Sequence, residues 1–243
     1  MTDVKNAKSP LGPQYPMRDP AGTAKFRHQA IAVILKTDIE EGLQVLLHRR
    51  LHEPFSGRWE LPSGSVEVNE NLDHSVRRHL SRYIDPHVIS HQEQLGTYSD
   101  VHRDPYDRTI ATSYLILVPW NVGEINRGEG QWQTVSHAGD LAFDHQRILG
   151  DGIDRLRAKL SYSNISFALA PHSFSIAQLR EAYRTVLGYD VAATNLQRVL
   201  ARRGQLEETG ELAKPPGGGR PAKLYRFTSQ QLRITDPFAA FKP

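Results

Sequence analysis

The apolar positions of the chain follow two different periods. Short runs rich in large apolar residues predict strands, and they lie at 30–36, 43–50, 59–62, 94–98, 109–119 and 132–135. Two other stretches, 71–83 and 149–160, place an apolar residue at every third or fourth position and therefore predict helices. Strands combined with two helices over about 135 residues predict one α+β domain.

The pattern changes after Tyr162. A capping-box signature at Ser175–Gln178 starts a helix that runs to Gly188, and a short turn leads to a second helix that ends at Gly204. Two short alternating runs on either side of a Gly-rich loop at 215–219 then predict a β-hairpin. Helix, turn, helix and hairpin is the order of a winged helix-turn-helix domain.

These patterns divide the chain into three parts. Residues 1–25 carry four prolines and few large apolar groups, which predicts a flexible N-terminal tail. We expect the α+β domain at 26–161 and the winged helix domain at 162–243. Lys and Arg number 19 against 21 Asp and Glu through residue 161, and 11 against 6 from residue 162 onward. The excess of positive charge in the second part is typical of a domain that binds a polyanion.

Composition removes several classes of function. The chain has no cysteine, which excludes disulfides, cysteine-ligated zinc or iron–sulfur sites and a cysteine nucleophile. Its 11 histidines show no metal-binding spacing. The apolar runs are far shorter than a membrane span, and no secretion signal precedes them. We therefore expect a cytoplasmic protein with no membrane partner.

One segment carries candidate chemistry. Trp59-Glu-Leu-Pro precedes Gly64, five residues separate Gly64 from Glu70, and seven separate Glu70 from Arg78. This spacing, with the change from loop to helix after Glu70, resembles the Nudix box. The resemblance covers about residues 26–160 and implies a Nudix-like α/β/α sandwich that handles derivatives of nucleoside diphosphates.

The helix of this box departs from the family pattern. Where the family carries three glutamates, this chain has His79, Arg82 and Tyr83, which share one helical face. Mg²⁺ requires oxygen ligands, and a guanidinium has no acceptor atom, so Arg82 cannot hold the cation. The sequence therefore predicts a domain that binds its ligand but does not cleave it.

Two alternatives remain open at this point. The spacing of the box can be a coincidence. Alternatively, the protein is a Nudix-type hydrolase of a nucleoside diphosphate derivative such as ADP-ribose, with metal ligands taken from elsewhere. The candidate ligands are then Glu60, Glu67, Glu70 and Asp104.

The ligand of the first domain is indicated by Trp59–Pro62 and the basic pair before it, which look like the Nudix subgroup that handles ADP-ribose. Arginine binds diphosphates with two donors at once, and glutamate accepts hydrogen bonds from ribose or adenine. A dense polar loop at 102–108 is a candidate rim. The predicted ligand-binding residues are Arg49, Arg50, Arg58, Glu60, Glu67, Arg103, Asp104, Tyr106 and Arg108. No catalytic residue, metal ligand or cofactor is predicted, and ADP-ribose is the expected effector.

The second helix of the C-terminal pair presents a polar face. Asn, Gln and Arg pair with base edges in the major groove, and Arg and Lys also contact phosphates. The predicted DNA-binding residues are Asn195, Gln197 and Arg198 for bases, Arg202 and Arg203 for phosphates, and Arg220, Lys223 and Tyr225 in the wing. A winged helix used only for protein contacts is the alternative.

The segment Gly218-Gly-Arg-Pro-Ala-Lys-Leu-Tyr225, together with Gly96–Asp100 and Phe143–His145, resembles the Nudix-related transcriptional regulators of NAD metabolism. The resemblance covers about residues 26–230. It implies a homodimeric repressor of genes for NAD biosynthesis or salvage, which binds a palindromic operator in double-stranded DNA and responds to ADP-ribose. In that family the recognition helix reads Asn-Phe-Arg-Arg, whereas this chain has a glutamine at 197. The operator sequence therefore stays open.

Overall fold

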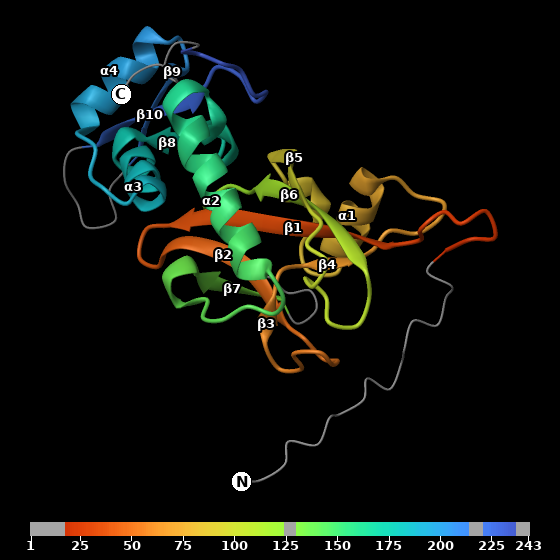
Figure 1. Cartoon of the computed structure of the whole chain (residues 1–243). Helices are drawn as coiled ribbons and strands as arrows, with labels where there is room; N and C mark the ends of the chain where they lie inside the picture. The colour runs from red at the N-terminus through yellow and green to blue at the C-terminus, as the bar shows by residue number, and fades with distance from the viewer. Residues whose placement is uncertain (1–17, 124–129, 214–220, 237–243) are drawn as a thin grey trace.

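A seven-stranded sheet forms the centre of the N-terminal part of the chain. The computed structural model describes residues 18–123, 130–213 and 221–236. The main path of the sheet has the order β3-β2-β1-β6-β5, with β4 paired to β1 and β7 paired to β2 (Figure 1). β1 and β6 are parallel, and the other pairs are antiparallel. The strands are β1 (Arg27–Asp38), β2 (Gly42–Arg49), β3 (Trp59–Glu60), β4 (Ser63–Ser65), β5 (His91–Tyr98), β6 (Thr109–Leu117) and β7 (Gly130–Thr134).

Two helices cover the opposite faces of this sheet. Along β1, Ala30, Ala32 and Ile34 face α1 (Leu72–Leu80), while the alternating residues from Ile31 to Leu35 face α2 (His145–Tyr162). A strand buried on both faces reads as a continuous apolar run, which is why β1 shows no alternation in the sequence. The three layers confirm the predicted α/β/α sandwich.

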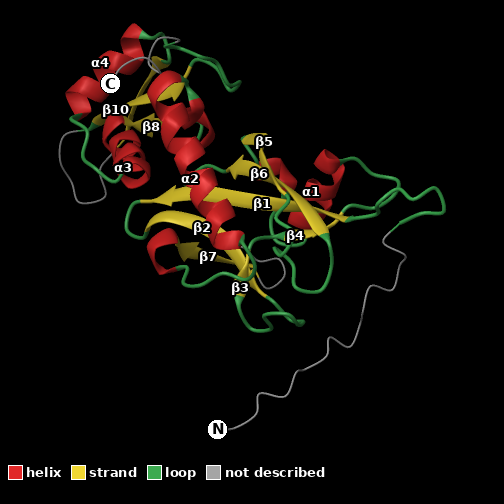
Figure 2. Ribbon diagram, viewed as in Figure 1, coloured by secondary structure: helices red, strands yellow, loops and turns green. Residues whose placement is uncertain are grey.

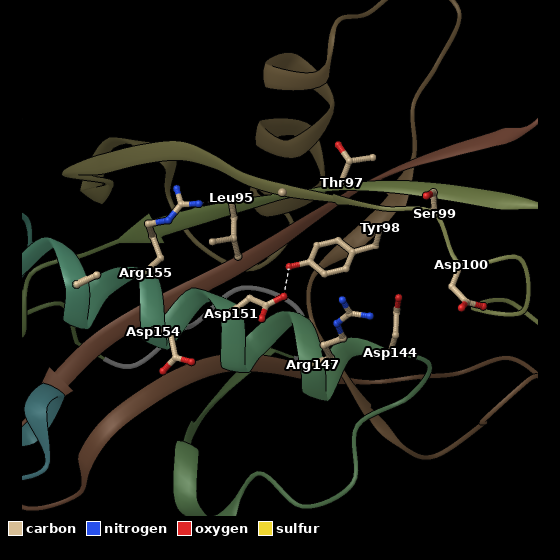
Figure 3. A pocket seen from close by; sticks show the side chains of 12 residues that line it. Leu95, Thr97, Tyr98, Ser99, Asp100, Asp144, Arg147, Asp151, Asp154 and Arg155 are labelled. Atoms are coloured by element: carbon tan, nitrogen blue, oxygen red, sulfur yellow. Dashed lines mark hydrogen bonds between the residues drawn. The ribbon is translucent and has the colours of Figure 1, made fainter. Parts of the chain in front are cut away.

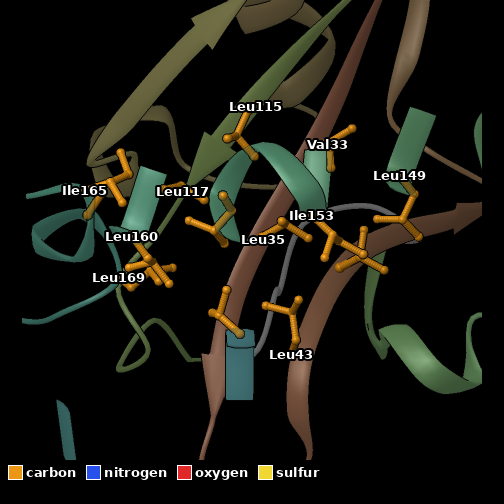
Figure 4. Packing of buried hydrophobic residues seen from close by; sticks show 14 of the residues in the cluster. Val33, Leu35, Leu43, Leu115, Leu117, Leu149, Ile153, Leu160, Ile165 and Leu169 are labelled. Carbon is orange, nitrogen blue, oxygen red and sulfur yellow. The ribbon is translucent and has the colours of Figure 1, made fainter. Parts of the chain in front are cut away.

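Helix α2 lies close to the sheet at Gly152. A Cβ atom on this residue would stand 2.8 Å from Cγ1 of Val33, so only a hydrogen fits there. Leu149, Ile153 and Leu160, three of the residues that the helical period selects, are buried in the same layer (Figure 4). The glycine inside a helix, a costly residue in that position, is explained by this close approach.

The C-terminal part is a winged helix domain (Figure 2). Ser175 and Gln178 form the predicted capping box at the start of α3 (Ile176–Leu187), and Gly188, with φ of 80°, ends that helix in the left-handed region. The second helix is α4 (Ala193–Arg202). The sheet of the wing has the order β8-β10-β9 and consists of β8 (Phe174–Ser175), β9 (Leu206–Ala213) and β10 (Ala222–Phe227). β8 was not predicted, because two residues give no readable period.

The two parts share a hydrophobic core. A single buried cluster extends from β1 and β6 of the sandwich to α3, α4 and β10 of the winged helix. Phe174 is fully buried, and the centre of its ring lies 5.9 Å from that of Trp120 and 5.1 Å from that of Phe227. Arg157 Nε on α2 donates to the Val186 carbonyl at the end of α3, at 2.9 Å. The boundary predicted after residue 161 therefore lies inside one packed body.

Short segments complete the connections. The 3₁₀ helices are η1 (Pro86–Val88), η2 (Val135–His137) and η3 (Ile165–Ala168). Residues 18–25, expected to belong to a loose tail, form a turn in which Asp19 accepts hydrogen bonds from the backbone of Ala21 and Thr23. The rest of the predicted tail lies outside the described residues. Within the described parts of the chain, no helix has the length and apolar character needed to cross a membrane.

Candidate ligand pocket and DNA-binding surface

The three family positions of the box are tied together by hydrogen bonds. Arg78 Nε donates to Glu70 Oε2 at 2.9 Å, and Arg78 Nη2 donates to the Ser65 carbonyl at 3.0 Å. The hydrogen bonds from Arg78 lower the pKa of Glu70 to about 2, so this carboxylate is charged and occupied by the guanidinium. A Cβ atom on Gly64 would stand 2.0 Å from Cε1 of His79, which explains the glycine. The three residues that define the spacing of the box therefore have structural roles in the folded protein.

The three positions at which the Nudix resemblance expects glutamates hold side chains with different surroundings. His79 is buried and its Nε2 lies 3.1 Å from the Ser65 carbonyl; burial lowers its pKa, so the ring is neutral. Tyr83 stacks on His48 with the ring centres 4.7 Å apart. Arg82 is exposed in the turn directly after α1. None of the three presents a carboxylate.

A cavity of about 340 Å³ opens beside this face. It contains both residues of the basic pair at the end of β2, as well as Arg82 and Tyr83. Its lining residues are His48, Arg49, Arg50, Leu51, His52, Glu60, Ser63, Arg82 and Tyr83. The structure thus brings Arg49, Arg50 and Glu60 of the predicted ligand-binding set together in one concave site.

The cavity is held in shape by its own charged residues. Arg50 Nη1 donates to Glu60 Oε2 at 3.1 Å, and the guanidinium of Arg50 lies over the ring of Phe143. Arg49 lies over the ring of Trp59 at 3.9 Å and donates to the Gly57 carbonyl at 2.7 Å. These contacts fix the orientation of both arginines while leaving them at the wall of the cavity.

Other predicted ligand residues lie elsewhere. Arg58 is exposed above the ring of Phe55, and Glu67 is exposed and uses its backbone N–H to bind Glu70. Tyr106 is exposed in the 102–108 loop. Arg108 donates to the Asp100 carbonyl. The cavity includes none of these side chains.

Two residues of the same loop require a correction. The Arg103 side chain is only 1% exposed, and its Nε and Nη2 donate to Asp144 at 2.9 and 2.7 Å. Asp104 is buried and accepts the backbone N–H groups of Tyr106 and Asp107. Both were predicted to form a ligand rim; the structure instead uses their polar atoms to shape the loop and to fix α2.

The N-terminal end of α2 connects this loop to the cavity. His145, the first residue of α2, is buried, and burial lowers its pKa to about 3. Its neutral Nδ1 accepts the backbone N–H of Leu61 at 3.1 Å, one residue after Glu60 of the cavity wall. The other end of α2 runs into the winged helix domain (Figure 1).

A second cavity, of about 750 Å³, lies between the edge strand β5 and α2 (Figure 3). Tyr98 Oη donates to Asp151 Oδ2 across it at 2.7 Å, and Arg155 donates to Glu93 and to the Leu95 carbonyl. Several of its charged groups are bound by neighbours outside the lining, such as Asp144 by Arg103 and Arg155 by Glu93. The sequence did not indicate this cavity.

The polar face of α4 has the character predicted for a DNA-reading helix. Leu196 and Leu200 are buried, while Asn195, Arg198 and Arg202 are exposed. Arg198 Nη2 donates to Asn195 Oδ1 at 2.8 Å, which orients both side chains. The exposed residues of α4 are therefore of the side-chain types that pair with base edges or phosphates.

Two predicted DNA contacts have structural roles instead. Arg203 Nη2 donates to Asp236 at 2.8 Å and its Nη1 to the Ser161 carbonyl, with 15% of the side chain exposed. Tyr225 is 8% exposed, and its hydroxyl donates to Glu208. The first joins α4 to the end of α2, and the second binds Gln197 and Glu208, so both side chains are engaged by protein partners in this structure.

Around Tyr225 the wing supports α4. Gln197 Nε2 donates to Tyr225 Oη at 2.9 Å, so the phenol positions a predicted base-reading residue. Lys223 is exposed but binds Glu208 at 2.9 Å. Arg220 lies outside the described residues.

Comparison with known proteins agrees with this architecture. A model of the NrtR DNA-binding winged helix domain matches residues 166–227. The ADPR responsive transcriptional repressor NtrR of Acinetobacter baylyi is 29% identical over 206 residues, which is 82% of each chain. The crystal structure of Shewanella oneidensis NrtR in complex with a 27mer DNA is 25% identical, with a TM-score of 0.71, and covers 82% of this chain and 93% of its own. These similarities support an NrtR-type, Nudix-related regulator.

The relationship also reaches the catalytic branch of the Nudix proteins. An ADP-ribose pyrophosphatase of Methanocaldococcus jannaschii is 33% identical over 132 residues, which is 52% of this chain and 74% of that protein. The NrtR architecture therefore joins a Nudix-like domain to a winged helix domain, as the sequence predicted.

Sequence reasoning missed several residues of this NrtR site. His48 and Tyr83 form a stacked wall, and Arg82 enters the cavity from the helix end. The sequence did carry a signal for Arg82 and Tyr83, because they occupy two positions of the box at which the resemblance expects ligand-facing glutamates. His48 carries no such signal, since its place follows from the pairing of β2 with β3.

Proposed function

We propose that this protein is a DNA-binding transcriptional repressor whose Nudix-like domain binds ADP-ribose as an effector and does not hydrolyse it. One observation carries the proposal: a cationic cavity at the altered box and a DNA-reading helix belong to a single packed body. The names of the Acinetobacter baylyi and Shewanella oneidensis proteins support both activities.

The lack of hydrolysis follows from the donor atoms. Among the described residues, no group of three or more acidic or histidine side chains is arranged to hold a metal ion. The two carboxylates nearest the box face, Glu60 and Glu70, are each bound to an arginine. Without a divalent cation a Nudix site has no means of activating water against a diphosphate.

Coupling between the two sites runs through α2. Its first residues bind the wall of the cavity through Leu61 and the 102–108 loop through Asp144. Its last residues contact α3 and the segment that carries Asp236. A ligand that binds more tightly to one position of this helix shifts the equilibrium between the two arrangements of the winged helix. The size of that shift is set by the difference between the ligand's affinities for the two states. The units that we assign to sensing and to DNA binding are residues 26–161 and 162–243.

The effect of ADP-ribose on a DNA complex tests the proposal. A duplex selected by the protein from a random pool is titrated with ADP-ribose, with NAD as the matched nucleotide control. We expect ADP-ribose to release the DNA, and we expect two protein chains on a palindromic duplex, as a homodimeric repressor of NAD-related genes requires. Sustained release of AMP and ribose phosphate in the presence of Mg²⁺ would instead establish the hydrolase alternative.

The role of α4 is tested by Arg198→Ala. We expect the affinity for the selected duplex to fall by about 1–3 kcal/mol, because a bidentate contact to a base is lost. ADP-ribose binding stays unchanged, since the residue lies in the other part of the molecule. Arg77→Ala, which removes an exposed arginine from α1, is the control. Equal loss in the two variants, measured by fluorescence anisotropy, would contradict the assignment of α4 as the reading helix.

A further inference from the structure

Arg82 occupies an unusual position at the cavity. It follows Ser81, the residue that caps the C-terminal end of α1, and its side chain lines the cavity. The C-terminal end of a helix carries partial negative charge and favours a cation beside it. Within the described chain, the Arg82 guanidinium has no hydrogen-bond or ion-pair partner. All of its donors are therefore available to a ligand.

The residues at this face do not fit a divalent cation. His79 is buried against Ser65, Tyr83 is stacked on His48, and Glu70 is bound by Arg78. A metal ion placed here would meet the positive charge of Arg82 in place of carboxylate oxygens, and like charges at short range repel. The same geometry suits an anion, because a guanidinium binds phosphate oxygens with two parallel hydrogen bonds.

The other two arginines of the cavity already bind protein groups. Arg50 is neutralised by Glu60, and Arg49 is held on Trp59 and the Gly57 carbonyl. Three guanidinium groups against one carboxylate leave an excess of positive charge, which matches a doubly charged diphosphate. Arg49 and Arg50 are thus each held by a protein group, whereas no described residue holds the guanidinium of Arg82.

We propose that Arg82 replaces the metal ion of the catalytic Nudix proteins, so that its guanidinium binds the diphosphate of the effector directly and recognition needs no divalent cation. This inference rests on the proposed function and assigns the charge-binding residue of its site. An arginine anchored to the protein holds the diphosphate in place but supplies no activated water. The exchange of Glu for Arg therefore retains the affinity for the diphosphate and removes its hydrolysis.

The test compares binding with and without metal in matched variants. ADP-ribose is titrated by calorimetry into the full-length protein in EDTA and again in excess Mg²⁺. The variants are Arg82→Gln, Arg82→Lys and the control Arg77→Gln, which removes an exposed arginine from the same helix outside the cavity. Both positions are exposed, so thermal unfolding is expected to match the parent protein in each case.

We expect the parent protein to bind ADP-ribose equally well in EDTA and in Mg²⁺. Arg82→Gln is expected to weaken binding about tenfold or more, because a charge-assisted hydrogen bond to the diphosphate is lost. Arg82→Lys is expected to recover part of the lost affinity, and Arg77→Gln is expected to bind ADP-ribose as tightly as the parent protein. A requirement for Mg²⁺, or equal affinities in Arg82→Gln and Arg77→Gln, would overturn the inference.

A second probe separates this inference from the proposed function. If the parent protein binds no ADP-ribose under either condition, the proposed effector is wrong. Titration with inorganic pyrophosphate in EDTA then decides the role of Arg82. Binding by the parent protein that Arg82→Gln weakens supports a metal-independent diphosphate site, and binding that is absent or unchanged in the variant refutes it.

Discussion

Phe174→Ala is expected to lower the free energy of unfolding by about 3–5 kcal/mol, the usual cost of removing a buried phenylalanine ring. The ring is fully buried between Trp120 of the sandwich and Phe227 of the wing. Truncation therefore leaves a cavity at the junction of the two parts. Urea unfolding followed by tryptophan fluorescence and by circular dichroism measures the loss. The three tryptophans all belong to the sandwich, so fluorescence follows the unfolding of that part. Circular dichroism follows the helices and strands of both parts.

The matched control for this prediction is Tyr189→Ala, an aromatic residue of the same domain with 63% of its surface exposed. We expect little change in that variant. We also expect the two spectroscopic transitions to coincide in the parent protein and to separate in Phe174→Ala, because the shared core couples the parts. Equal stability of both variants would show that the winged helix domain does not depend on this core.

The second large effect is expected for Arg103→Ala. Removing one partner of a buried ion pair leaves an unpaired charge and commonly costs about 3–5 kcal/mol. The value here lies near the lower limit, since 21% of the Asp144 side chain is exposed and water can reach it. Thermal and urea unfolding measure the change. The matched control is Arg108→Ala in the same loop, whose guanidinium lies over the partly exposed ring of Phe26.

A double variant distinguishes structure from ligand binding at Arg103. If the arginine fixes the start of α2, Arg103→Ala combined with Asp144→Ala is expected to recover part of the lost stability, because the unpaired carboxylate is gone. The affinity of the folded protein for ADP-ribose then changes little. A variant with unchanged stability but a lost affinity for ADP-ribose would instead support Arg103 as a ligand-binding residue.

The position of Arg103 also bears on regulation. Its bond to Asp144 and the bond of His145 to Leu61 hold the same end of α2 against two sides of the sandwich. Glu60 of the cavity wall is thus the chain neighbour of Leu61, whose backbone N–H binds the first residue of α2. Because the other end of α2 belongs to the shared core, a shift of this helix would also move its contacts with the winged helix domain.

The features predicted well from sequence depend on neighbours along the chain. The capping box at Ser175–Gln178, the glycine at 188 and the apolar period of α2 are local patterns, and each lies where it was expected. The exposed face of α4 follows from the same helical period. The altered box was also readable, because its spacing requires no knowledge of distant contacts.

The predicted site residues that the structure places in structural contacts are those whose surroundings depend on distant partners. Arg203 was read as a phosphate contact from its place at the end of a basic helix, yet its partner Asp236 lies 33 positions further along. Tyr225 and Arg103 likewise bind groups from other elements. A charged or polar residue has the same appearance in a sequence whether it faces solvent or a buried partner, so burial had to come from the fold.

The amino-acid sequence by itself determined the two kinds of domain and the amphipathic pattern of their helices, and it predicts α4 as the helix that faces DNA. Only the tertiary structure decided which arginines reach the cavity, which ones hold the fold, and that both domains share a core. The physical reason is that periodicity and capping act within a few residues, whereas the burial and pairing of a charge depend on segments brought together by folding.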